Sequence, residues 1–197
     1  MLAKFRMLSV TDHLPRGRGG LLCGQQGSQI AEFAVALPVL ILVMIGISDF
    51  SGAFNLKQRL ASSAAATARL AAEQSPADLG SASPPSVTAL RNFVVQSLTA
   101  AGLSDCGLGS AAAASTGTLQ WTYTGGTCTS NATLVVERGY NFPVVAGGST
   151  VRVLATRVTL NYPYQWRFGN VVKLISPAAT FAGPTTLSVV SIVPNLS

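Results

Sequence analysis

The sequence is poor in the residues that most enzymes use for catalysis. It has one histidine, His13, and only seven aspartates and glutamates among 197 residues. Without a histidine beyond position 13, the rest of the chain cannot build a Ser-His-Asp or Cys-His arrangement or a histidine-containing zinc site. The few carboxylates are dispersed, and there is neither a P-loop nor a dinucleotide fingerprint. We therefore expect no enzyme, no catalytic residue, no cofactor and no metal.

Charge of either sign is also scarce. Charged residues make up 10% of the chain and hydrophobic residues 48%. The formal net charge is +6, and half of it precedes residue 28, where the charged residues are Lys4, Arg6, Arg16, Arg18 and Asp12. Such a positive segment ahead of an apolar run is typical of a membrane-orientation signal.

The later basic residues do not form the dense stripe that binds nucleic acid. They include Arg138, Arg152, Arg157, Arg167 and Lys173. A basic patch is one interpretation of this set, and a solvated strand face is the one we prefer. We expect no nucleic-acid partner.

Cysteine is limited to three positions, Cys23, Cys106 and Cys128. If the later part of the chain lies outside the cytoplasm, Cys106 and Cys128 can pair as a candidate disulfide. Such a bond would contribute about 3 kcal/mol by constraining the unfolded chain. The alternative is two free buried cysteines.

The most informative stretch is an apolar run that begins after Gly27. No charged residue occurs from Phe33 to Ser48, and with its flanks the run reaches the roughly 20 residues that span a bilayer core. Helix-forming residues continue to Gln74, so we predict one helix over 28–74 whose N-terminal half is transmembrane. Its second half has an alanine-rich face, which we expect to pack on the protein's own domain or on a neighbouring helix.

The rest of the chain predicts a small α+β domain over 87–197, after a linker over 75–86. A helix is expected over 87–101, because Val87, Leu90, Val94 and Leu98 share one face. An antiparallel sheet of about four strands should follow, at 118–123, 132–137, 150–162 and 185–193. We expect a bulge near Thr156, a hairpin turn at Gly147-Gly148 and an irregular segment over 107–117.

Alternating aromatic residues follow the strongest predicted strand. They are Tyr162, Tyr164, Trp166 and Phe168. They could form an exposed aromatic face for a partner, or they could pack in the core and at the edge of the sheet, which is the interpretation we prefer.

The start of the apolar run resembles a known family. The features that carry the resemblance are Gly27-Ser28, the pair Glu32-Phe33, the pair Leu37-Pro38 and an exit at Gly46-Ile47-Ser48-Asp49-Phe50. In this order they are similar to the N-terminal signature of TadE-like proteins. These are pseudopilins of the tight adherence (Flp pilus) secretion and assembly system. The resemblance covers roughly residues 27–72, and the long leader over 1–27 departs from the family's pattern.

The resemblance implies roles for four residues. A prepilin peptidase would cut between Gly27 and Ser28, on the cytoplasmic side. The new amine at Ser28 would lie one helical turn from Glu32, whose carboxylate would pair with it or with that of a neighbouring subunit, to support assembly. The alternative for Glu32 is a carboxylate that reaches the membrane interface and has no task. Pro38 would kink the helix, or weaken it so that it can bend on leaving the bilayer.

The resulting hypothesis is a membrane-anchored minor pseudopilin or assembly component of a Tad-type pilus. It would be a single-pass protein of the bacterial inner (cytoplasmic) membrane, with a cytoplasmic N-terminus and an extracytoplasmic C-terminal domain. Its partners would be the prepilin peptidase, other pilins and pseudopilins, the Tad secretion machinery and membrane lipid. The alternative is an uncleaved single-pass protein with an extracytoplasmic binding domain.

Overall fold

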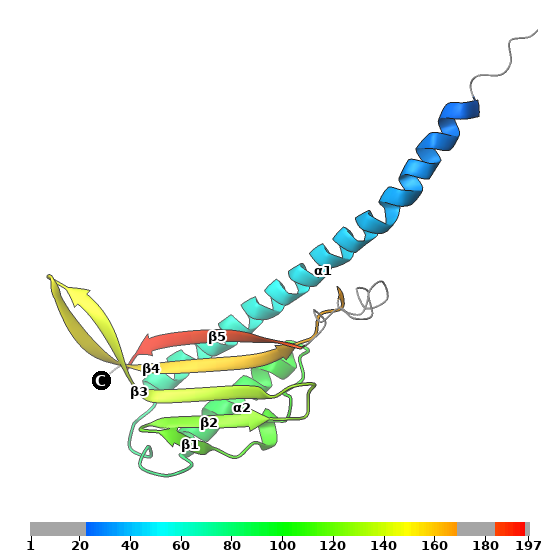
Figure 1. Cartoon of the computed structure of the whole chain (residues 1–197). Coiled ribbons are helices and arrows are strands. Elements are labelled where there is room, and N and C mark those ends of the chain that lie inside the picture. Colours follow the sequence, from blue (N-terminus) through cyan, green and yellow to red (C-terminus); the bar gives the residue numbers. More distant parts are fainter. Residues whose placement is uncertain (1–22, 169–183, 196–197) are drawn as a thin grey trace, which may run out of the picture. The chain divides into compact units, whose positions relative to one another are not determined.

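The computed structural model describes residues 23–168 and 184–195. The described residues form, in chain order, α1 (Cys23–Glu73), α2 (Pro85–Ala100), a 3-10 turn η1 (Leu108–Ser110), β1 (Ala114–Gly117), β2 (Gln120–Gly125), β3 (Ala132–Ala146), β4 (Ser149–Tyr164) and β5 (Thr185–Pro194). Figure 1 traces them. The predicted fold class is confirmed: a long apolar N-terminal helix precedes a small α+β domain with an antiparallel sheet. The chain divides into two compact units, Met1–Ile41 and Leu42–Ser197.

Helix α1 is continuous through Pro38. It begins at Cys23, five residues before the predicted start, because an established helix propagates through a glycine such as Gly27 at a cost of only about 1 kcal/mol. It ends at Glu73, just ahead of Ser75-Pro76. The Arg138 guanidinium donates a hydrogen bond of 2.8 Å to the carbonyl of Gln74, and this satisfies a group that the helix leaves without a partner.

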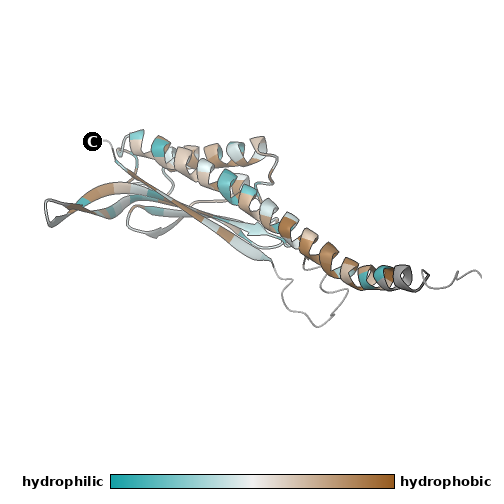
Figure 2. Ribbon diagram, turned by 90° about the horizontal axis from the view of Figure 1, so that it is seen from above, coloured by the Kyte–Doolittle hydropathy of each residue, from teal (hydrophilic) through white to brown (hydrophobic). Residues whose placement is uncertain are grey.

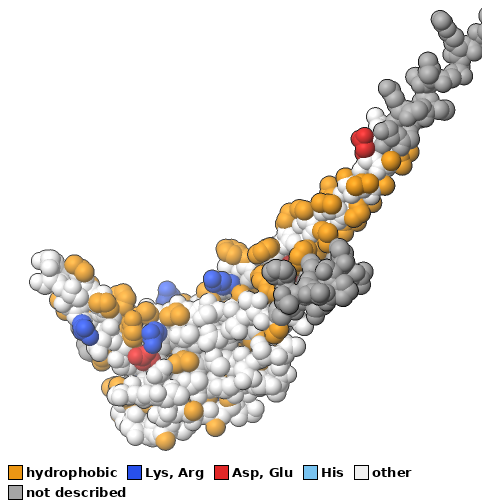
Figure 3. Space-filling view, in the orientation of Figure 1, with side chains coloured by type: hydrophobic (Ala, Val, Ile, Leu, Met, Phe, Trp, Pro, Cys, Tyr) orange, Lys and Arg blue, Asp and Glu red, His pale blue; other side chains and the backbone are white. Residues whose placement is uncertain are grey.

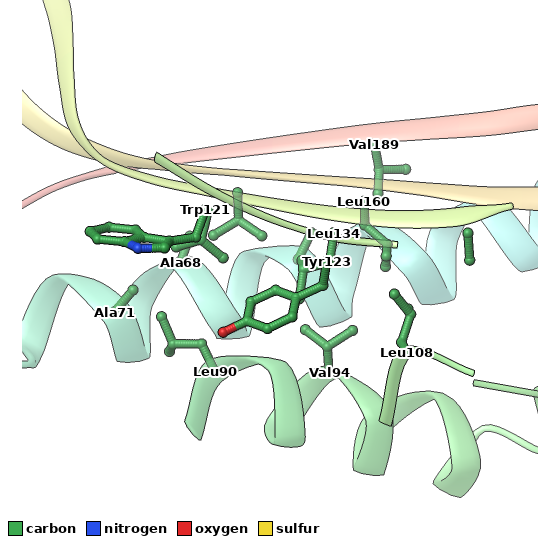
Figure 4. Close-up of a cluster of buried hydrophobic side chains, with 14 of the residues drawn as sticks. Ala68, Ala71, Leu90, Val94, Leu108, Trp121, Tyr123, Leu134, Leu160 and Val189 are labelled. Carbon is green, nitrogen blue, oxygen red and sulfur yellow. The ribbon is translucent and has the colours of Figure 1, made fainter. Parts of the chain in front are cut away.

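The alanine-rich face of α1 is buried in the core of the domain. Leu60, Ala64, Ala68 and Ala71 are fully buried and belong to the same cluster as buried side chains of α2 and the sheet. Figure 4 shows Ala68 and Ala71 below the sheet residues Trp121, Leu134 and Leu160. Small side chains on this face allow the helix backbone to approach the sheet closely.

The sheet is a meander in which neighbours along the chain are also neighbours in space, in the order β1-β2-β3-β4-β5, with every pair antiparallel. One face supplies the core through alternate residues, among them Trp121, Tyr123, Leu134, Val136, Val158, Leu160 and Val189. Both helices pack on this face (Figure 4). The opposite face is richer in polar residues, as is usual for an antiparallel sheet covered on one side.

Helix α2 presents the face that the sequence predicts. Val87, Leu90, Val94 and Leu98 are its buried residues. Its N-cap, Pro84, cannot supply a side-chain hydrogen bond. Asp78, in the preceding linker, supplies the capping acceptor instead. Its carboxylate accepts hydrogen bonds from the Ser86 amide at 2.7 Å and from the Ser86 hydroxyl at 2.8 Å. These bonds hold the pKa of Asp78 below its usual value.

A bulge interrupts the pairing of β3 and β4 near Thr156. Between the pairs Glu137–Arg157 and Tyr140–Ala155 the register shifts, so Arg138 and Gly139 together face Thr156. The extra residue therefore belongs to β3, whereas the sequence indicates a bulge at Thr156, the β4 residue that faces it. Beyond the bulge, residues 141–146 and 149–154 pair with each other as a two-stranded arm that ends at the Gly147-Gly148 turn. Both turn glycines have positive φ, as type I′ hairpin turns require.

Two expectations need correction. Arg138 does not lie on a solvated strand face, because the bulge turns its side chain inward, where it is 4% exposed. Burial lowers its pKa, and the charge of Asp78 opposes that shift. Residues 107–117, predicted to be irregular, contain η1 and the short strand β1. Lys173, of the same basic set, lies outside the described residues.

The tight packing of α1 generates a prediction about stability. Ala68→Leu inserts a larger side chain at a fully buried position and should lower the free energy of unfolding by about 1–3 kcal/mol. Ala61→Leu makes the same change at an exposed position of α1 and should be close to neutral. Urea unfolding of the full chain in detergent, followed by circular dichroism, measures both. Equal effects of the two variants would show that the face is not tightly packed.

Candidate membrane anchor and processing site

The N-terminal half of α1 exposes apolar side chains. Ile30, Phe33, Val35, Val39, Met44 and Ile47 are each more than 60% exposed. Figure 2 colours this part of the helix ribbon mostly as hydrophobic, and Figure 3 shows hydrophobic side chains along it. The helix from Gln29 to Glu73 is long and apolar enough to cross a membrane, judged by length and composition. Since water disfavours an apolar surface of this extent, α1 is compatible with a single-pass membrane anchor.

The residues expected to take part in processing lie at the start of this helix. Gly27 and Ser28 are within α1. Glu32 is exposed and lies four positions after Ser28, which places the two backbone positions one helical turn apart. Pro38 lies six positions after Glu32 on the same helix, about 1.7 turns further along.

The apolar run ends at a buried carboxylate. Asp49 is 5% exposed, and its Oδ2 atom accepts a hydrogen bond of 2.6 Å from the backbone N–H of Phe168. The Tyr164 hydroxyl donates to the backbone carbonyl of Asp49 at 3.1 Å. The end of β4 is therefore tied to the turn of α1 that follows the apolar run. Sequence reasoning gave Asp49 no role of its own, and the signals were its place in the exit Gly46-Ile47-Ser48-Asp49-Phe50 and its position as the first carboxylate after the run.

Aromatic residues at the end of β4 and just after it pack beside the Asp49 turn of α1. The ring of Trp166 lies 5.2 Å from that of Phe50 and 5.0 Å from that of Tyr164, measured between centroids. The indole N–H of Trp166 donates to the Thr185 hydroxyl at 2.7 Å. Burial raises the pKa of the Tyr164 hydroxyl and the negative charge of Asp49 raises it further, whereas the charge of Arg167 opposes the shift.

Tyr162 completes the aromatic set. It is 7% exposed, and its hydroxyl donates to the Ser104 carbonyl at 3.0 Å. Burial raises its pKa, as does the nearby carboxylate of Asp105. Tyr162 is thus buried and Tyr164, Trp166 and Phe168 are partly buried, so the alternative of an exposed aromatic face does not describe them.

A disulfide joins Cys106 and Cys128, with an S–S distance of 2.06 Å. Cys106 is fully buried, and its carbonyl accepts a hydrogen bond from the Thr127 amide at 3.0 Å. The bond connects the segment after α2 to the loop between β2 and β3. Within the described residues, no group of three or more histidine, cysteine, aspartate or glutamate side chains is placed to hold a metal ion.

The buried acceptor at Asp49 can be tested by substitution. Asp49→Ala leaves the Phe168 amide without its charged acceptor and should lower the free energy of unfolding by about 1.5–3 kcal/mol. Glu73→Ala removes the same charge at an exposed position of α1 and should change it by less than about 0.5 kcal/mol. Urea unfolding of the full chain in detergent measures both. A neutral Asp49→Ala would contradict the contact between Asp49 and Phe168.

Comparison with known proteins bears on the same segment. A family model described as TadE-like protein matches residues 27–69. The chain matches no curated protein and no solved structure. The family match begins at Gly27 and covers the apolar run, Glu32, Pro38 and Asp49. Over residues 27–69 the chain is therefore similar to TadE-like proteins, as its residues indicated.

Proposed function

We propose that the protein is a minor pseudopilin or assembly component of a Tad-type (Flp) pilus. The observation that carries the proposal is the TadE-like match over residues 27–69, which coincides with an exposed apolar helix. Four basic residues against one acid precede residue 28 and favour a cytoplasmic N-terminus. The C-terminal domain then lies outside the inner membrane, where the Cys106–Cys128 disulfide is stable.

In this proposal the protein acts by assembly and carries out no chemistry of its own. A prepilin peptidase removes residues 1–27 and leaves a cationic amine at Ser28. Glu32, one turn along the helix, is the counter-ion for this amine or for that of an adjacent subunit. A charge in the bilayer centre costs roughly 2.5–3.5 kcal/mol, and less near the interface, so this pairing favours entry of the helix among other pilin helices. Pro38 lets the helix adjust as it leaves the bilayer.

Processing is tested at the cleavage site. When the full chain is co-expressed with a prepilin peptidase, intact-mass measurement should find Ser28 as the first residue. Gly27→Leu should block cleavage, because the side chain occupies space that the glycine leaves to the peptidase. Gly24→Leu, a matched change within the leader, should be cleaved normally.

Two results would contradict this part of the proposal. One is Gly27→Leu processed as efficiently as the natural chain. The other is a natural chain that keeps Met1, or that is cut beyond Asp49, which would favour the uncleaved single-pass binding protein or a conventional signal sequence.

The role of Glu32 in assembly is a separate test. Glu32→Ala should be cleaved at Gly27 but enter the assembly roughly tenfold less, the effect of about 1.4 kcal/mol. Quantitative blotting of the sheared pilus and membrane fractions measures this, and Glu73→Ala is the matched loss of a carboxylate on the same helix. Assembly of Glu32→Ala at the natural level would show that Glu32 has no such task.

A further inference from the structure

A cavity of about 620 Å³ lies beside the end of the apolar run. Its wall includes Asn55 and Arg59 of α1, Tyr162 and Tyr164 of β4, and the following Gln165 and Arg167. Cavities of this size hold small molecules or head groups. The cavity lies within the unit formed by residues 42–197.

The charges in the wall favour an anion. Among the described residues, two arginines, Arg59 and Arg167, line the cavity together with one carboxylate, Asp49. The Asp49 carboxylate is already an acceptor for the Phe168 amide. The Arg59 guanidinium is oriented by a hydrogen bond of 2.9 Å from Nη1 to the Ala101 carbonyl, which leaves its other N–H groups as donors. Arginine N–H groups match the geometry of phosphate oxygens.

The position of the cavity along α1 identifies the source of the anion. The uncharged run ends at Ser48, and Ser48, Asp49, Ser51 and Gly52 are the next part of the cavity wall. Phe50 and Phe54, at the same level, are 70% and 64% exposed. The ring of Trp166 lies against those of Phe50 and Tyr164, and tryptophan and tyrosine gather where a membrane helix meets the head groups. If α1 is the membrane anchor, as the proposed function holds, the cavity therefore lies at the depth of the lipid phosphates.

We propose that this cavity binds the phosphate of an anionic phospholipid head group, with Arg59 and Arg167 as its cationic ligands. The bound lipid fixes the depth of α1 in the outer leaflet. It also occupies the surface where the end of β4 meets the helix. The inference depends on the membrane anchoring in the proposed function and does not depend on cleavage at Gly27.

Native mass spectrometry of the full chain in a nonionic detergent counts the bound molecules. With added phosphatidylglycerol, one lipid should remain bound. Arg59→Gln and Arg167→Gln should each raise the apparent dissociation constant about fivefold, since a basic residue near a lipid surface contributes about that factor. Arg69→Gln, the same change at an exposed position further along α1 and outside the cavity wall, should leave binding unchanged.

Two further measurements separate the remaining outcomes. Inorganic phosphate, added in place of the lipid, should bind much more weakly; equal affinity at the same arginines would identify free phosphate as the ligand and overturn the lipid assignment. An affinity for phosphatidylglycerol in the Arg59→Gln/Arg167→Gln double variant equal to that of the natural chain would overturn the site.

The folding of the variants is checked separately. Arg167 is exposed, so Arg167→Gln should keep the fold, and circular dichroism checks the variants that carry Arg59→Gln. Failure of binding in a chain that is still cleaved at Ser28 would refute this inference and leave the proposed function standing.

Discussion

The packing of the alanine-rich face of α1 against the sheet is the contact on which the domain depends. Leu60, Ala64, Ala68 and Ala71 cover the inner face of the strands together with α2. The same helix begins as the apolar segment and ends as part of the core. The second half of α1 is thus a structural part of the domain, because its removal would expose the buried side chains of the sheet to water.

Polar contacts fix the elements that this packing brings together. Arg138, turned inward by the bulge in β3, donates to the carbonyl of Gln74 just after α1, and its backbone carbonyl accepts from the Asn195 side chain after β5. Asp78 holds the start of α2. The two helices are linked by a hydrogen bond between the Ser63 and Ser97 hydroxyls. Each of these contacts joins segments that the chain separates, so they specify one arrangement of the packed layers.

Local patterns predicted most of the elements, whereas contacts between distant residues escaped them. Helix α1, the buried face of α2 and the strands β4 and β5 follow from periodicity and from breakers such as Ser75-Pro76. Strand β3 continues beyond its predicted end at Glu137 through Gly139 and Pro143, which are poor strand residues, and β1 contains only small residues that carry little signal. In the candidate site, Gly27, Ser28 and Glu32 form a local motif. The role of Asp49 depends on Phe168, 119 residues away, and no local pattern encodes such a contact.

The tip of the two-stranded arm is a suitable place to label the protein on intact cells. At its tip, a side chain added at Gly147 or Gly148 would meet no atom within 4 Å, and the core lies elsewhere, on the other side of the bulge. Exposed hairpin tips of this kind accept inserted sequence readily. A short peptide epitope between these glycines would therefore let antibodies locate the protein on intact cells, and report which compartment its domain occupies, while the anchor and the packed layers stay as they are.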